Sequence, residues 1–323
     1  MHRIAALRSF LFMLILGVSV GMLDGAGGDY KIYLEIYNSM PDSEGHFEWL
    51  YSQLMLVFNF FGASFIIFQF FIYTFSMVIL SLSLPERYKS TLTFYVLLVL
   101  FSIIFSLGIP RQFLAMALLT PLMINVFEHT KISTKALLMG LLSIFIHKPA
   151  ILVGVILFAL HYSHLFFKVV FSTLALLLLL LIIDFDFVAF NYRLYISSDI
   201  SSAGAFVRYA VFVMPIALVL YWSKNEEMRQ KTKLFMYASF ALLLLTVFGL
   251  VSSTFLDRLM LYFIPIYLIF YNKFIFLFTN IQRPLIDITI SATTIFLFYL
   301  WLFFRDSAEN WRNASNYIFG GMI

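Results

Sequence analysis

Long apolar runs separated by short polar stretches dominate the pattern of this chain. A helix needs about 20 mainly apolar residues to cross the hydrocarbon layer of a membrane, with a range of roughly 17–25. On this criterion the pattern predicts an all-α polytopic integral membrane protein, with about 11 transmembrane helices (range 10–12) in a single domain of residues 1–323. The expected spans are residues 4–23, 62–84, 91–108, 112–128, 133–146, 149–166, 168–184, 208–222, 233–251, 257–272 and 284–304.

Two stretches depart from this pattern and are predicted to lie outside the membrane. Residues 24–61 form the first extracytoplasmic segment, and its apolar part, 47–61, is too short to span, so we interpret it as an interfacial or re-entrant helix. Residues 184–208 form the longest interior polar segment and are expected to be an extracytoplasmic loop.

Composition supports the membrane interpretation. The chain is 62% hydrophobic and 12% charged, with a mean hydropathy of +0.95. Soluble domains carry roughly 25% charged residues, so a soluble fold is excluded. The absence of cysteine excludes disulfides, thiol catalysis and thiolate metal sites.

The distribution of basic residues predicts the orientation. Cytoplasmic segments of membrane proteins carry an excess of Lys and Arg. Placing the N-terminus in the cytoplasm puts most of the 21 basic residues on the inner side. The basic start at Arg3 and Arg8, followed by an apolar run, is also typical of a signal peptide. No clean A-x-A cleavage site follows it, so an uncleaved first span is the prediction.

Several arginines oppose this orientation, because they fall at the expected outer ends of helices. These are Arg111, Arg208 and Arg258, with Arg193 a looser candidate. A guanidinium matches phosphate oxygens with a fixed fork of donors and stays charged. The grouping therefore suggests an anion site, although arginines that extend to lipid headgroups remain the alternative.

His147 and Lys148 interrupt an otherwise apolar stretch, and Pro149 follows directly. Polar groups in hydrocarbon are costly, so a function is a reasonable hypothesis. A histidine with a pKa near 6.5 suits general-base chemistry at neutral pH, and the charge of Lys148 would disfavour the imidazolium. A packing histidine with a hydrogen bond is the alternative.

The segment after the first span carries Asp29, Tyr30 and Tyr33. Tyr30, Tyr33 and Tyr37 share one face of a helix. Carboxylates and tyrosines suit a hydroxyl-rich ligand, whereas an interfacial aromatic belt is the competing interpretation. Asp184 and Asp186 have the spacing of a metal-binding pair, but no zinc-type cluster is present, and neither metal nor cofactor is predicted.

Five stretches, taken in order, carry a family resemblance: "GGDYKIYLEIYNSM…FEWLYSQLMLVFNFFG", "IPRQFLAMALL", "IHKPAIL", "DRLMLYFIPIYLIFY" and "NWRNASNYIF". Together they resemble the EpsG family, whose members are Wzy-like polymerases of bacterial exopolysaccharide, capsule or O-antigen. The resemblance covers nearly the whole chain. The matching positions are Asp29, Tyr33, Arg111, Gln112, His147, Arg258 and Tyr262. Lys148 departs from the family pattern, in which a small or polar residue is more usual.

The resemblance implies a glycosyltransferase in the bacterial inner membrane. It would transfer a growing glycan from undecaprenyl pyrophosphate onto the next lipid-linked repeat unit at the outer face. Expected partners are these lipid-linked oligosaccharides, membrane lipid, and a flippase and chain-length regulator of the pathway, with no nucleic acid. The expected catalytic residues are His147, Asp29, Arg111 and Arg258. The expected substrate-binding residues are Tyr30, Tyr33, Gln112, Lys148, Arg193, Arg208 and Tyr262.

Other classes of protein remain open at this point. A flippase or transporter would need arginines near the membrane midplane and inverted repeats, and the sequence shows no repeat. An O-antigen ligase or a metal-dependent lipid-sugar transferase would give Asp184 and Asp186 a role, and chelation of divalent ions would abolish the latter activity. A structural scaffold would give no reason to group Arg111, His147 and Arg258.

Overall fold

The computed structural model describes residues 2–23, 30–40, 47–106, 109–128, 131–162, 209, 213, 216–221, 226–247 and 253–304. The regular elements in these ranges are all helices, which confirms the predicted all-α class. The first half comprises α1 (His2–Gly21), α2 (Tyr30–Asn38), α3 (Trp49–Phe60), α4 (Phe65–Ser83), η1 (Glu86–Tyr88), α5 (Leu92–Ser106), α6 (Pro110–Glu128), α7 (Thr134–Ile146) and α8 (Ala150–His161). The second half comprises α12 (Glu226–Val247), α13 (Ser253–Tyr262), α14 (Ile264–Ile275) and α15 (Arg283–Phe304).

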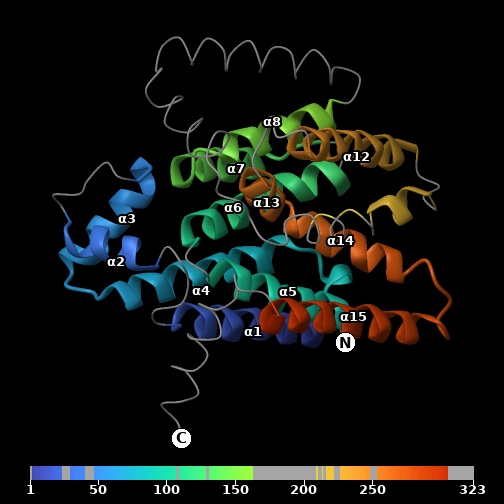
Figure 1. Ribbon diagram of the computed structural model, residues 1–323, viewed down its shortest axis with the longest axis horizontal. Helices are drawn as coiled ribbons and strands as arrows, with labels where there is room; N and C mark the ends of the chain where they lie inside the picture. The colour runs from blue at the N-terminus through green and yellow to red at the C-terminus, as the bar shows by residue number, and fades with distance from the viewer. Residues whose placement is uncertain are drawn as a thin grey trace, which may run out of the picture.

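The helices lie side by side in layers (Figure 1). In this view α1, α5 and α15 lie along one side, α7, α8 and α12 along the other, and α6 runs between them. Most side chains of α6 are buried, because it packs against α4, α7 and α8. A helix that is apolar around its whole circumference is expected at the centre of such a bundle.

Close contact between α1 and α4 depends on two glycines. A Cβ atom at Gly17 would lie 2.9 Å from the Cα of Thr74, and one at Gly21 would lie 2.6 Å from the Cα of Phe70. Real Cβ atoms do not approach backbone this closely. Any larger residue at either position would force α1 away from α4.

Helix lengths give partial support to the predicted spans. In the described part of the chain, α4 is long and apolar enough to cross a membrane, and α13 with α14 adds a second span if the bent pair counts as one. Other apolar helices, such as Thr134–Ile146 and Ala150–His161, are shorter. The number of about 11 spans therefore stays a prediction. The expected span 168–184 and loop 184–208 lie outside the described residues.

The span predicted for residues 257–272 is not one straight helix, because α13 and α14 meet there at an angle of 67°. Pro265 occupies the first turn of α14, and the turn residue Phe263 separates the two helices. Proline lacks an N–H group and its ring collides with the preceding turn of a helix, which favours a kink or a break at this position. The helix also begins earlier than predicted, at Ser253, so Arg258 lies within α13 and not at the end of a helix.

Two further breaks place polar residues at the same end of the bundle. The chain leaves α5 at Ser106 and enters α6 at Pro110, a position that suits proline because its missing N–H needs no partner there. His147 ends α7 in an extended conformation (φ −155°, ψ 106°), and Pro149 then leads into α8. The predicted break at His147 is thus confirmed.

Candidate functional site

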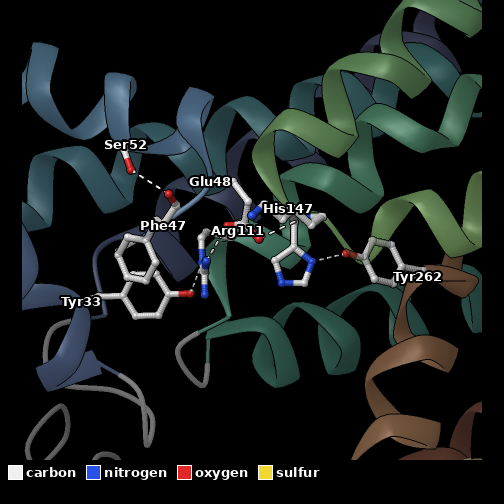
Figure 2. A network of polar contacts seen from close by, with 8 residues as sticks. Tyr33, Phe47, Glu48, Ser52, Arg111, His147 and Tyr262 are labelled. Carbon is white, nitrogen blue, oxygen red and sulfur yellow. Dashed lines mark hydrogen bonds and ion pairs between the residues drawn. The ribbon is translucent and has the colours of Figure 1, made fainter. Parts of the chain in front are cut away.

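Arg111, the second residue of α6, is the centre of a polar network at one end of the bundle (Figure 2). Its Nε donates to the hydroxyl of Tyr33 at 2.7 Å, and its Nη1 donates to Oε2 of Glu48 at 2.5 Å. The guanidinium carbon lies 4.1 Å from the ring centroid of Phe47. The Arg111 side chain is 20% exposed, so its charge is held in a partly desolvated position.

An aromatic pair supports this guanidinium. The rings of Tyr33 and Phe47 stack with centroids 4.8 Å apart and an interplanar angle of 23°. Tyr33 belongs to α2, whose buried face is formed by Tyr30, Tyr33 and Tyr37, and this confirms the predicted shared face. Contact between a cation and the face of an aromatic ring is favourable, so the pair fixes the plane of the Arg111 guanidinium.

Arg111 keeps hydrogen-bonding capacity after these contacts. Within the described part of the chain, no partner is recorded for its Nη2. A guanidinium edge that is charged, oriented and not yet paired can donate to phosphate oxygens. The geometry therefore fits the predicted anion site.

Glu48 joins Arg111 to the loop that carries His147. Its Oε2 accepts from Arg111, and its Oε1 accepts from the backbone N–H of Lys148 at 3.1 Å. Burial alone would raise the pKa of Glu48, but the positive charge of Arg111 and the hydrogen bond from the backbone N–H of Lys148 lower it below its usual value. Glu48 is therefore an anion. Sequence reasoning missed this residue as a site member, although a charged residue directly before the apolar stretch Trp49–Phe60 was a usable signal.

His147 is buried at the break between α7 and α8. Its Nδ1 hydrogen bonds with the hydroxyl of Tyr262, the last residue of α13. Burial, and then the charges of Arg111 and Arg258, lower the pKa of His147 to about 3, while Glu48 opposes this shift. The imidazole is consequently neutral at physiological pH, and a general base must be neutral before it can accept a proton.

Arg258 reaches the same region through α13. The side-chain Nε2 of Gln112 donates to the backbone carbonyl of Arg258 at 2.5 Å, which ties the start of α6 to α13. Tyr262, four residues after Arg258 in α13, hydrogen bonds with His147, so α13 lies beside both the start of α6 and the break after α7. The structure thus gathers Arg111, His147 and Arg258 at one place, although their positions in the sequence are far apart.

The remaining predicted residues lie in different surroundings. The Lys148 side chain is exposed. Tyr262 is 1% exposed, and its hydroxyl hydrogen bonds with His147. Tyr30 is buried edge-on against Phe65, with ring centroids 5.4 Å apart. Outside the described residues lie Asp29, Arg193, Arg208, Asp184 and Asp186. In the part of the chain that is described, no group of three His, Asp or Glu side chains could hold a metal ion.

Comparison with known proteins decides the family. A model of the EpsG family matches residues 6–319. The chain belongs to the EpsG family. Membership of the EpsG family supports a role as a membrane-associated polymerase in polysaccharide biosynthesis. No curated protein and no solved structure gives a significant match to the chain.

Proposed function

We propose that this EpsG protein is a Wzy-type polysaccharide polymerase. It transfers a growing glycan from undecaprenyl pyrophosphate onto a lipid-linked repeat unit at the outer face of the bacterial inner membrane. The observation that carries the proposal is that hydrogen bonds bring the segments of Arg111, His147 and Arg258 together at one end of the bundle, in a chain of this family. The product could serve O-antigen, capsule or exopolysaccharide.

Arg111 and Arg258 supply the charge that the leaving group requires. As the anomeric C–O bond breaks, negative charge develops on the pyrophosphate that remains on the lipid. Donors that are already oriented in a desolvated site stabilise such charge without reorganisation. Arg111 meets this condition, because Glu48, Tyr33 and Phe47 already hold its guanidinium.

His147 takes the proton of the acceptor hydroxyl in this scheme. When Nδ1–H donates to Tyr262, the lone pair of Nε2 is the one available to a substrate. A pKa of about 3 makes the imidazole a weak base in the free protein. A bound pyrophosphate would offset the charges of Arg111 and Arg258, which raises the pKa of His147 when the donor is present. Asp29 is better suited to hold the sugar.

The activity assay compares two variants of the purified protein with lipid-linked repeat units at saturating concentration. His147→Ala should lose the transfer step by about 10²–10⁴-fold and still bind lipid, whereas Asp29→Asn should mainly weaken binding. His161→Ala, at the far end of α8 from His147, is the matched control. Near-normal transfer by His147→Ala would remove this residue as the base.

A second experiment tests the membrane topology. With the N-terminus in the cytoplasm, reporter fusions within Lys224–Lys233 should read as cytoplasmic, and fusions within Asp24–Gly45 should read as extracytoplasmic. At about 1.5 Å per residue, the 19 residues of α6 extend about 28 Å, close to the hydrocarbon thickness. Reversed reporter results would place the site on the wrong side for an undecaprenyl-linked repeat unit and would defeat the proposal.

A further inference from the structure

We propose that Glu48 is a positioning residue for the transfer reaction, one that holds the anion-binding arginine and the base in a single geometry. This inference rests on the polymerase function proposed above. It concerns a residue to which neither the sequence reasoning nor the family resemblance gives a role. The carboxylate acts through Arg111 and the His147 loop and does not itself touch the reacting atoms.

The two oxygens of this carboxylate bind two different donors. One oxygen accepts from Nη1 of Arg111 at 2.5 Å, and the other accepts from the backbone N–H of Lys148 at 3.1 Å. Arg111 starts α6, and Lys148 directly follows His147 in the break between α7 and α8. Glu48 therefore bridges the start of α6 and the break between α7 and α8 at the point where the proposed catalytic groups lie, in addition to the direct packing of these helices.

Burial gives this link its rigidity. The Glu48 side chain is 10% exposed, and Phe47 beside it lies under the guanidinium of Arg111. Glu48 immediately precedes α3, and α3 packs against α7. A displacement of about 1 Å in a group that positions substrate costs on the order of 10²-fold in rate, so a fixed link of this kind matters for catalysis.

A carboxylate of this length is required at the position. Both groups that Glu48 contacts are donors, so both of its ends must be acceptors, and glutamine would turn an N–H₂ toward one of them. Aspartate keeps both acceptors and the charge, but it is shorter by one carbon–carbon bond of about 1.5 Å. It cannot reach Arg111 and the Lys148 amide together.

The Glu48 charge also has a predictable effect on ligand affinity. A negative charge against Arg111 opposes the binding of any anion there, so its removal should strengthen binding of a diphosphate. Loss of position should at the same time slow transfer. Opposite changes in binding and in rate are the signature that separates positioning from a general role in stability.

The experiment uses the full-length protein, purified in detergent, with lipid-linked repeat units and with inorganic pyrophosphate as a competing anion. Glu48→Gln should lower kcat by about 10²-fold, while the inhibition constant of pyrophosphate falls about threefold to tenfold. Glu48→Asp should lower kcat by about 10-fold or more and leave pyrophosphate inhibition nearly unchanged, because the charge remains. Glu35→Gln, an exposed glutamate of α2, is the control and should behave as the wild type.

Two results would overturn the inference. One is a kcat for both Glu48 variants within twofold of the wild type. The other is a parallel loss of transfer and pyrophosphate binding in Glu48→Asp, which would mean that the residue supports only the folded state. Failure of the proposed function looks different, because the wild-type protein itself would then form no polymer from lipid-linked repeat units.

Discussion

A cluster of polar groups around one buried carboxylate lies at each end of α6, and the two carboxylates have different partners. At the far end from Arg111, Glu128 pairs with Arg87 through Oε2 and with Lys273 through Oε1, the latter at 2.5 Å. At the site end, Glu48 pairs with Arg111 and with one backbone amide. Both carboxylates are largely buried, with exposed side-chain fractions of 7% and 10%.

The far cluster has the features of a structural anchor. The ring of Tyr88 lies 4.9 Å from the guanidinium carbon of Arg87 and 5.7 Å from Nζ of Lys273. Asn272 donates to the backbone carbonyl of Tyr88 at 2.8 Å. These contacts tie the turn η1 to the ends of α6 and α14. The Arg87 side chain itself lies mostly in solvent, because it is 61% exposed.

The difference between the clusters lies in how each holds its cations. Glu128 binds two cations, of which Arg87 is 61% exposed to solvent, whereas Glu48 holds one partly buried cation, Arg111, which Tyr33 and Phe47 also contact. The site end also holds His147, which is buried and neutral. The number of charges is thus a poor guide to function, and the burial and fixed orientation of a charge are better ones.

Paired arginine substitutions should give the largest contrast. Arg111→Ala should lower transfer by about 10²–10³-fold at normal protein level, because the donor to the developing pyrophosphate charge is lost. Arg111→Lys should restore little, since lysine keeps the charge and loses the fork. Arg87→Ala, in the far cluster, should leave transfer per folded molecule unchanged. Full activity of Arg111→Lys would favour an arginine that simply contacts lipid headgroups.

Removal of Glu128 should act on stability instead. Glu128→Ala leaves Lys273 and Arg87 without their partner, and such a loss in a partly buried pair should cost about 2–3 kcal/mol of folding free energy. Thermal unfolding in detergent would measure this, together with transfer per folded molecule, which should stay normal. An unchanged melting temperature combined with lost transfer would contradict the assignment of this cluster as an anchor.

Acid should destabilise the folded protein through the buried His147. The pKa of His147 is about 3 in the folded protein and about 6.5 when unfolded, so the unfolded state binds the proton between these values. The stability that depends on neutral His147 is complete above pH 6.5 and is lost as the pH falls toward 3. At pH 4.5 the wild type should lose about 2 kcal/mol more than His147→Gln, relative to pH 7. Equal losses in unfolding experiments would show that His147 does not titrate as a buried group.

Tyr262→Phe should give the smallest effect. It removes the hydroxyl on Nδ1 of His147 and leaves the ring packing largely unchanged. One lost hydrogen bond of about 1 kcal/mol corresponds to a decrease in kcat of about fivefold to tenfold, with little change in KM. A large rise in KM with normal kcat would instead indicate that Tyr262 binds substrate, as the family resemblance suggested.

The sequence by itself determined the helices and most of their breaks. Apolar runs of helical length set the bounds of elements such as α4 and α6, because a backbone in an apolar environment must satisfy its own hydrogen bonds. Proline and glycine determined where α5 gives way to α6 and where α7 ends. The same local signals picked out Arg111 and His147, since polar residues at helix breaks stand out against apolar neighbours.

Only the tertiary structure decided which side chains meet. The pairs Arg111–Glu48, His147–Tyr262 and Gln112–Arg258 are separated by 63, 115 and 146 positions. Periodicity reports which face of a helix is buried, but it contains no information about which distant helix covers that face. The role of Glu48 follows from such contacts. Its two oxygens can accept from Arg111 and from the Lys148 amide only when α6 and the break between α7 and α8 lie beside the start of α3.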